Sequence, residues 1–303
     1  MVYRAYDPEL DRQIALKLVR SSAEDTTHDA TRLVREARSM AKITHPNVAT
    51  VYDAGLVDDA VFIAMELIEG PTLDRWLWTT ARPWTEILRM YLLAGRGLAA
   101  AHDAGLVHRD FKPDNVMVGP DARPRVLDFG LARPAALDDE DELLLPSEDS
   151  VRFDPETLAA FESEYEAASR AADLEPLASI SGTFDLQLDV TQTGLVTGTP
   201  AYMAPEQHEG LDGGPAADQF AFCVSLWEAL YRQRPYPGED MFEIADAIME
   251  GHLAPPPSHH RVPTWVQPLL ERGLARTPSE RHPSMRSLLA SFVFTFKVMH
   301  GLS

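Results

Sequence analysis

The chain has few of the features that mark secreted, membrane-spanning or nucleic-acid-binding proteins. Its 303 residues include one cysteine, Cys223, which excludes a disulfide within the chain, fits a reducing cytoplasm and is predicted to be a core residue. The longest apolar stretches, 220–230 and 292–299, are shorter than the roughly 20 residues of a membrane span. Only 27 Lys and Arg stand against 47 Asp and Glu, a net charge of -20, so we expect no nucleic acid partner.

The excess acid is concentrated in one segment, residues 134–190. This segment contains 16 Asp and Glu residues and two arginines, so it carries -14 of the net charge of -20. Asp154 and Pro155 form a typical helix start and are followed by apolar residues at helical spacing, which predicts one amphipathic helix. A largely disordered acidic spacer is the alternative, because the flanks are aperiodic.

The remaining sequence predicts two lobes of different composition, of α+β class. The length exceeds that of a comfortable single core, and 45% hydrophobic residues suffice to fill two. A small lobe of strands with one helix is predicted first, in the order Tyr3–Tyr6, Ile14–Val19, helix Asp29–Ile43, Val48–Tyr52 and Val61–Leu67. A helical lobe follows, with helices at Trp84–Asp103, Trp265–Leu274 and Ser284–Phe296.

The polar residues with the clearest chemistry lie in two loops that follow predicted elements. "HRDFKPDN" spans His108–Asn115, and "DFG" begins at Asp128 directly after a short apolar run. Phosphoryl transfer requires metal ligands, a group that takes the proton of the attacking hydroxyl, and cations near the phosphates. Asp128 and Asn115 offer oxygens that suit Mg²⁺, Asp110 can accept the proton, and Lys112 can neutralise the phosphoryl group.

These segments resemble the motifs of the eukaryotic-like protein kinase family. Their amino-acid sequences are similar to those of its bacterial serine/threonine members. His108–Asn115 is similar to H-R-D-L-x-x-x-N, with Phe in place of Leu, and Ile14–Lys17 is similar to V-A-I-K. Asp128–Gly130 is D-F-G, and Gly198–Gln207, "GTPAYMAPEQ", resembles the segment before the peptide cleft. One such motif alone means little, but several in family order from Val2 to about Leu289 make a chance match improbable.

The resemblance implies a protein kinase-like bilobal fold, with a β-rich N-lobe at 1–68 and an α-helical C-lobe at 69–303. The acidic segment 134–190 would be an insert in the activation loop of this kinase domain, which would span residues 1–303. The implied reaction is transfer of the ATP γ-phosphate to Ser and Thr hydroxyls of protein substrates, with ATP and Mg²⁺ as cofactors.

The resemblance also assigns roles to individual residues. Asp110 would be the base, Lys112 its electrostatic helper, and Asn115 and Asp128 the metal ligands. Lys17, paired with Glu36, would anchor the phosphates, while Glu66 and Ile68 of the hinge would meet the adenine through their backbone. Further implied positions are the adenine contacts Val2, Ala15 and Met117, the gatekeeper Met65, a spine of His108, Phe129 and Met40, Asp218 beneath the catalytic loop, and a Glu206–Arg281 pair.

One departure from the family pattern lies at the start of the sequence. The glycine-rich loop G-x-G-x-x-G-x-V would end at Met1-Val2, so its three glycines are not in this sequence. We expect that the sequence starts at an internal methionine of a longer protein; a real truncation is the alternative. Because those glycines let backbone N–H groups approach the phosphates, we predict weak or no activity for residues 1–303 alone.

The acidic insert is the second departure. A phosphate on Thr191 or Thr193, at its far end, could pair with Arg109 and order the segment. The insert would hinder this ordering by repulsion or recruit a basic partner; a tolerated surface insertion without a role is the alternative.

Two other functions compete with the protein kinase interpretation. A pseudokinase or fragment acting as a binding module is favoured by the absent glycines and disfavoured by intact Lys17, Asp110 and Asp128. A small-molecule phosphotransferase is disfavoured by "GTPAYMAPEQ". His259 and His260 are predicted to form a polar loop tip, since no cysteine or acid lies at ligand spacing.

Overall fold

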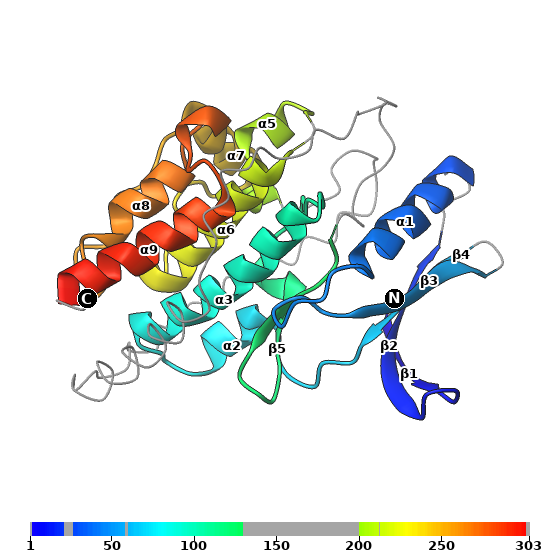
Figure 1. The fold of residues 1–303 in the computed structure, drawn as a ribbon. Coiled ribbons are helices and arrows are strands. Elements are labelled where there is room, and N and C mark those ends of the chain that lie inside the picture. The colour runs from blue at the N-terminus through cyan, green and yellow to red at the C-terminus, as the bar shows by residue number, and fades with distance from the viewer. Residues whose placement is uncertain (1, 21–26, 58–59, 130–199, 212, 301–303) are drawn as a thin grey trace.

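The structure of the protein is a computed structural model that describes residues 2–20, 27–57, 60–129, 200–211 and 213–300. The acidic insert with its predicted helix, Gly130, Gly198 and the two threonines Thr191 and Thr193 lie outside the described residues. The described chain forms the α+β architecture predicted, with a β-sheet lobe and a helical lobe (Figure 1).

The N-lobe is an antiparallel sheet of four strands in the order β1-β2-β4-β3. The strands are β1 (Val2–Asp7), β2 (Arg12–Arg20), β3 (Val51–Val57) and β4 (Ala60–Glu66). The β1–β2 turn is closed by Asp7, whose carboxylate accepts the backbone N–H groups of Glu9 and Leu10. Among the described strands β1 lies at an edge.

One predicted strand was wrong in position. The sequence places a strand at Val48–Tyr52, but β3 begins at Val51 and continues to Val57. Val48 instead forms a bridge with Val126 of the C-lobe, where Ala49 N–H donates to the Val126 carbonyl at 3.0 Å. The apolar run therefore serves two different sheets, which periodicity alone does not reveal.

Helix α1 (Thr27–Met40) packs on the N-lobe sheet through one apolar stripe. Val34, Ala37 and Met40 are spaced at i, i+3 and i+6 and are all buried.

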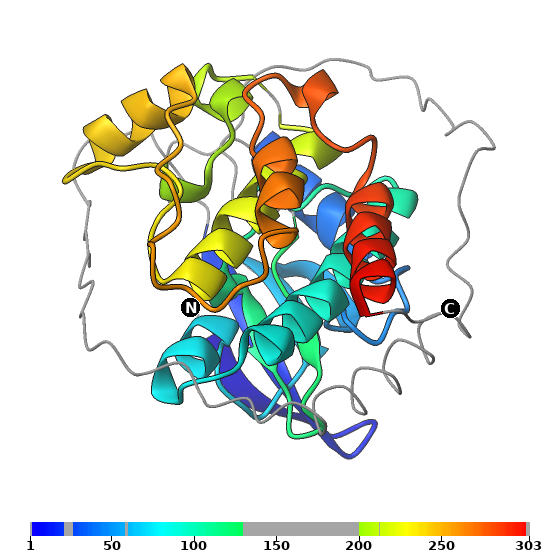
Figure 2. The ribbon, with the colours of Figure 1, turned by 90° about the vertical axis from the view of Figure 1, so that its left-hand side faces the viewer.

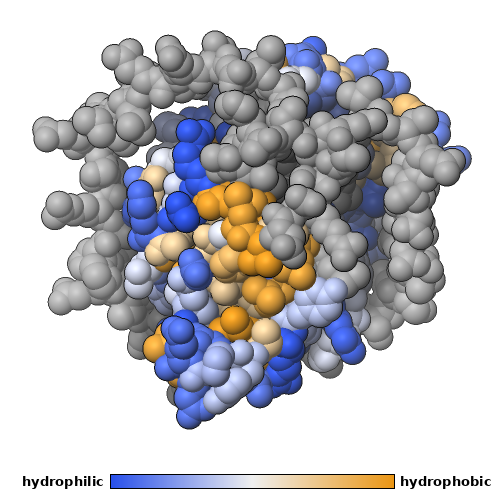
Figure 3. All heavy atoms as spheres, turned by 90° about the vertical axis from the view of Figure 1, so that its right-hand side faces the viewer, coloured by the Kyte–Doolittle hydropathy of each residue, from blue (hydrophilic) through white to orange (hydrophobic). Residues whose placement is uncertain are grey.

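The space-filling view shows hydrophobic side chains gathered on one face of the molecule, bordered by hydrophilic ones (Figure 3).

The C-lobe is built around two long helices, α3 (Trp84–Asp103) and α6 (Pro215–Tyr231). Most of their side chains are buried, including Cys223, which confirms its prediction as a core residue; burial raises the pKa of its thiol. Helix α9 lies beside α3 and α8 (Figure 2). The other helices are α2 (Leu73–Thr79), α5 (Pro205–His208), α7 (Met241–Glu250), α8 (Val266–Gly273) and α9 (Met285–His300), with 3-10 turns η1 (Pro113–Asn115), η2 (Pro200–Tyr202) and η3 (Pro278–Glu280).

A small hairpin of β5 (Val116–Val118) and β6 (Pro124–Val126) connects the lobes. The Asn47 side chain donates to the Pro124 carbonyl at 2.9 Å, and a methyl group on Gly97 of α3 would collide with the Asn47 carbonyl oxygen. Glycine is therefore required where α3 meets the N-lobe connection. Within the described parts of the chain, no helix combines the length and apolarity that a membrane crossing requires.

Candidate active site

The loop His108–Asn115 is held from below by one buried carboxylate. Asp218, in the first turn of α6, accepts the N–H of His108 through Oδ2 and the N–H of Arg109 through Oδ1, both at 2.7 Å. Arg109 has φ of 66°, a left-handed conformation that costs about 1–3 kcal/mol for a residue with a side chain. The two bonds to Asp218 hold this strained turn in place, as the sequence predicts for Asp218.

Asp218 remains ionised although its side chain is inaccessible to solvent. Burial opposes its charge, but the hydrogen bond from His102 at 2.7 Å and the bond from His108 N–H lower its pKa below the usual value. A charged acceptor strengthens each of these bonds, because hydrogen bonds to an ionised partner are the stronger kind. The loop thus rests on a carboxylate that carries its full charge at neutral pH.

His108 is fully buried and connects the loop to the residues before Asp128. Its Nε2 donates to the Leu127 carbonyl at 2.8 Å, and its Nδ1 accepts the N–H of Asp110 at 3.3 Å. Burial lowers the pKa of His108, so the ring is neutral and this tautomer satisfies both partners. The centroid of the Phe129 ring lies 4.8 Å from that of His108, so these two members of the predicted spine are in contact; Met40, the third, is buried.

The carboxylate of Asp110 lies between two donors from its own loop. Lys112 Nζ is 3.2 Å from Asp110 Oδ2, and Asn115 Nδ2 donates to the same oxygen at 3.2 Å and to the Asp110 carbonyl at 2.7 Å. The Asn115 backbone carbonyl in turn accepts the N–H of Leu127 at 2.8 Å. The structure therefore brings together the three predicted catalytic side chains on one loop.

Asp128 joins this group from the second loop. Its backbone also has a left-handed φ, 58°, and its Oδ1 lies 2.9 Å from Nζ of Lys17 on β2. This ion pair connects the N-lobe sheet to the C-lobe loops. The two loops lie next to each other, because the Leu127 N–H donates to the Asn115 carbonyl and His108 Nε2 donates to the Leu127 carbonyl, both at 2.8 Å.

The predicted ion pair between Lys17 and Glu36 was wrong in its partners. Glu36 Oε1 lies 3.6 Å from Nη1 of Arg109, and Lys17 is paired with Asp128. No ion pair within 4.0 Å joins Lys17 and Glu36, both of which are described. The sequence shows which charges are available, but the choice among several opposite charges depends on the relative placement of α1, β2 and the catalytic loop.

The predicted adenine contacts lie on three strands, two of the N-lobe and one of the C-lobe. Ala15 is buried on β2, Met117 is half-buried on β5, and Val2 is 59% exposed on the edge strand. Glu66 pairs with Ile14 across the sheet, and its carboxylate lies 3.1 Å from Nε of Arg125. A hollow of about 410 Å³ beside the hinge is lined by Leu67 and Ile68 with side chains that sequence reasoning did not select, Gln13, Asp121 and Arg125.

The oxygens of Asn115 and Asp128 fit a magnesium ion better than a transition metal. Because Asn115 Nδ2 donates to Asp110, the amide oxygen is the atom left to face a cation. Asp128 uses Oδ1 for Lys17 and has a second carboxylate oxygen. Mg²⁺ is typically held by one or two protein oxygens together with water and phosphate. The described residues contain no cluster of three His, Cys, Asp or Glu that would suit a softer metal.

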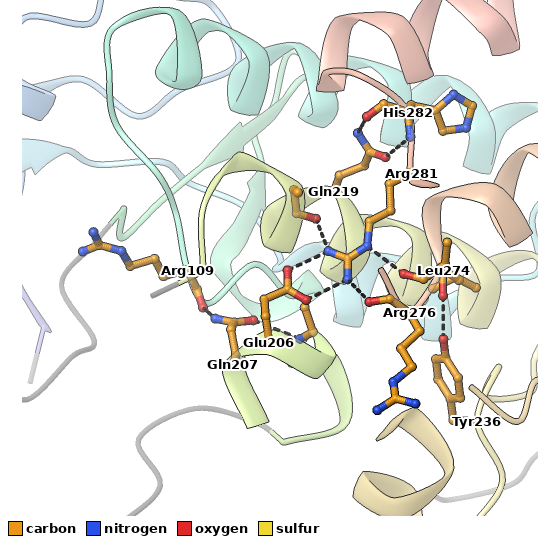
Figure 4. A network of polar contacts seen from close by, with 12 residues as sticks. Arg109, Glu206, Gln207, Gln219, Tyr236, Leu274, Arg276, Arg281 and His282 are labelled. Carbon is orange, nitrogen blue, oxygen red and sulfur yellow. Dashed lines mark hydrogen bonds and ion pairs between the residues drawn. The ribbon is translucent and has the colours of Figure 1, made fainter. Parts of the chain in front are cut away.

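The end of the predicted segment Gly198–Gln207 is fastened to the core by Arg281. Its guanidinium is buried and meets Glu206 in a bidentate pair with both distances 2.7 Å, as predicted (Figure 4). It also donates to the carbonyls of Ala275, Ala216 and Arg276. Beside Glu206, Gln207 donates to the Arg109 carbonyl, a contact that sequence reasoning missed because no pattern marks it.

Comparisons with known proteins agree with this geometry. The sequence model described as "Protein kinase domain" matches residues 1–156, and "Protein tyrosine and serine/threonine kinase" matches residues 184–292. The chain is 30% identical over 289 residues to serine/threonine-protein kinase PknA of Mycobacterium tuberculosis, covering 93% of this chain and 55% of the relative. It is 30% identical over 293 residues to PknL of the same organism, covering 93% and 58%, and 28% identical over 305 residues to pkn3 of Myxococcus xanthus, covering 95% and 46%. The chain thus spans about half the length of the relatives it matches.

Proposed function

The chain belongs to the protein kinase family, in its bacterial serine/threonine branch, and from this premise we propose that it transfers the γ-phosphate of ATP to protein Ser and Thr hydroxyls. The observation that carries the proposal is the 2.9 Å contact between Lys17 and Asp128. It joins a cation of one lobe to an oxygen ligand of the other, beside the loop that bears Asp110. Phosphoryl transfer depends on such positioning more than on covalent chemistry.

The proposed step uses Asp110 as the proton acceptor. The substrate hydroxyl oxygen forms a bond to the γ-phosphorus, the bond from that phosphorus to the β–γ bridging oxygen breaks, and ADP leaves. The hydroxyl proton passes to Asp110, whose position is fixed by Asn115 and by the His108 ring. Lys112, 3.2 Å from Asp110, places positive charge where the phosphoryl group passes. Mg²⁺, when bound through Asn115 and Asp128, neutralises phosphate charge.

Lys17 would exchange its partner when ATP binds. Its ammonium, here paired with Asp128, would turn to the α and β phosphates, and the Asp128 carboxylate would then be available to the metal. The exchange trades one anionic partner of Lys17 for another, so it requires no burial of an unpaired charge.

A binding module without catalysis is the second candidate. The pairing of Glu36 with Arg109, and not with Lys17, favours it. In that role the two lobes would dock a protein partner, and the acidic insert, outside the described residues, would recruit a basic one. For either role we propose the cytoplasm as the place of action, because the single cysteine fits a reducing compartment.

Radiolabelled transfer separates the two candidates. The chain and a form extended upstream of Met1 are each incubated with γ-³²P-ATP, Mg²⁺ and a basic protein, and the labelled amino acids are identified after acid hydrolysis. The kinase proposal expects phosphoserine and phosphothreonine that disappear when EDTA removes Mg²⁺. ATP binding without any transfer, also in a form extended upstream of Met1, would establish the binding module instead.

A further inference from the structure

Gln207 connects helix α5 to the backbone of the catalytic loop. Its Nε2 donates to the Arg109 carbonyl at 2.9 Å, and its Oε1 accepts the N–H of Ala204 at 3.0 Å. Both partners have fixed roles, since a carbonyl only accepts and an N–H only donates. The orientation of the amide is therefore determined by the contacts themselves.

The carbonyl that accepts the hydrogen bond of Gln207 belongs to the peptide unit between Arg109 and Asp110. In a planar peptide, the oxygen of Arg109 and the N–H of Asp110 are parts of one rigid unit. Gln207 fixes the oxygen end, and His108 Nδ1 accepts the N–H end at 3.3 Å. The preceding N–H, that of Arg109, is held by Asp218 at 2.7 Å. Three side chains from three parts of the chain thus clamp the turn that aims Asp110.

The base of this clamp is rigid. Glu206, adjacent to Gln207, is paired in bidentate fashion with the buried Arg281, which contacts three backbone carbonyls (Figure 4). Helix α5 therefore cannot shift without breaking a buried ion pair. Because the backbone of Gln207 is fixed in this way, its side-chain amide holds the Arg109 carbonyl at a defined position.

We propose that Gln207 is a positioning residue for Asp110: it holds the peptide that follows the left-handed Arg109 and so couples the end of the peptide-cleft segment to the proton acceptor. The proposal rests on the proposed function for its effect on the reaction, but the clamp itself can be tested without catalysis. Removing the donor leaves the Arg109 carbonyl without this partner and frees the peptide to rotate.

Gln207→Glu is the most informative variant because it separates the clamp from helix capping. The carboxylate can still accept the N–H of Ala204 and is favourable in the first turn of a helix, so α5 is retained. The amide nitrogen that faces the Arg109 carbonyl is replaced by a carboxylate oxygen, and the two oxygens repel each other. Gln233→Glu is the matched control: Gln233 also donates to a backbone carbonyl, that of Pro255, but at the surface.

Hydrogen exchange measured by mass spectrometry on the full chain tests the clamp directly. We expect the peptide covering residues 106–114 to exchange faster in Gln207→Glu than in the wild type, and equally fast in Gln233→Glu and the wild type. Unchanged exchange in Gln207→Glu, with an unchanged melting temperature, would overturn the proposal. This outcome does not depend on whether the chain transfers phosphate.

Kinetics then test the coupling to the reaction. In Gln207→Glu we expect kcat to fall about 10- to 100-fold at unchanged KM for ATP, the effect of a misplaced reacting group. The deficit relative to wild type should shrink as the pH falls toward the ordinary glutamate pKa of about 4.3, because the introduced carboxyl group regains a donor when it is protonated. If the wild type transfers phosphate and the variant matches it at every pH, the positioning role is refuted. If the wild type transfers none, also in the form extended upstream of Met1, the proposed function fails while the exchange experiment still judges the clamp.

Discussion

Nζ of Lys17 on β2 lies 2.9 Å from Oδ1 of Asp128, and this ion pair joins the sheet of the N-lobe to the loop of the C-lobe that bears Asp128. Both side chains are about a quarter exposed or less, so the pair is partly shielded from water and salt. In this pair the two opposite charges neutralise each other, and in the proposed function phosphate and Mg²⁺ would enter between them. The first two predictions follow from this pair.

Lys17→Met should abolish most phosphate transfer. It removes the cation that would hold the α and β phosphates, and we expect kcat/KM for ATP to fall at least about 100-fold, which is roughly 2.7 kcal/mol of transition-state stabilisation. Steady-state kinetics at varied ATP measure this. Lys42→Met, at an exposed position after α1, is the control and should match the wild type. Equal losses in the two variants would assign the effect to net charge and not to the site.

Asp128→Asn should remove the effect of magnesium on nucleotide binding. In the wild type we expect ATP to bind more tightly with Mg²⁺ than with EDTA, because Asp128 and Asn115 together hold the ion. In Asp128→Asn the two affinities should approach each other to within about threefold. Isothermal titration in both buffers measures the difference, with Asp246→Asn at an exposed position of α7 as control. A magnesium effect of wild-type size in Asp128→Asn would show that the ion is held elsewhere.

Arg281→Ala should be strongly destabilising, because it leaves Glu206 and three backbone carbonyls without their donor in a buried site. Breaking one side of a buried ion pair costs about 3–5 kcal/mol of unfolding free energy. The comparison is Arg286→Ala, which breaks a largely exposed pair with Asp103 and should cost about 1 kcal/mol or less. Urea unfolding gives both values. A loss for Arg281→Ala no larger than that for Arg286→Ala would contradict the anchoring role.

His282→Gln should weaken the dependence of stability on pH. Burial lowers the pKa of His282 below its ordinary value of 6.5, and Arg272 lowers it further, so the unfolded chain binds the proton more readily than the folded one. Its contribution to stability is therefore lost as the pH falls below about 6.5, by up to about 1.36 kcal/mol per pH unit. Gln keeps a donor for the Leu269 carbonyl but does not titrate.

Urea unfolding at pH 7.5 and 5.5 checks this prediction. The wild type should lose more unfolding free energy between these two values than His282→Gln does. A residual slope is expected in the variant, because His45, His108 and His208 also have lowered pKa values. Identical slopes in the two proteins would mean that His282 is protonated equally in the folded and unfolded states.

The sequence predicted the fold class and the contents of the site better than the contacts within it. Motif spacing placed Asp110, Asn115 and Asp128 on two adjacent loops, because loops that follow a helix and a strand in this order converge. The family resemblance also implied the pair of Glu206 with Arg281, which the structure contains. Short apolar runs were less reliable: Val48 was assigned to the wrong sheet, since a run that is buried on both sides has no periodicity.

Side-chain partners were predictable only where family likeness supplied them, and not always then. Glu36 pairs with Arg109 and not with Lys17. Which of these two cations Glu36 reaches depends on how α1 packs against the sheet, and the sequence does not show this packing. Gln207 could not be selected from sequence, since an amide next to an acid has no distinctive pattern. Such contacts depend on tertiary geometry and become visible only in the structure.

The central claim is that Asp110 takes the proton from a substrate hydroxyl in a site assembled by Lys17, Asn115 and Asp128. Single-turnover transfer from γ-³²P-ATP to a basic protein by wild type and Asp110→Asn tests it most directly. We predict that the rate falls about 10²- to 10⁴-fold in Asp110→Asn while the affinity for ATP is unchanged. Transfer by Asp110→Asn at the wild-type rate would contradict the account.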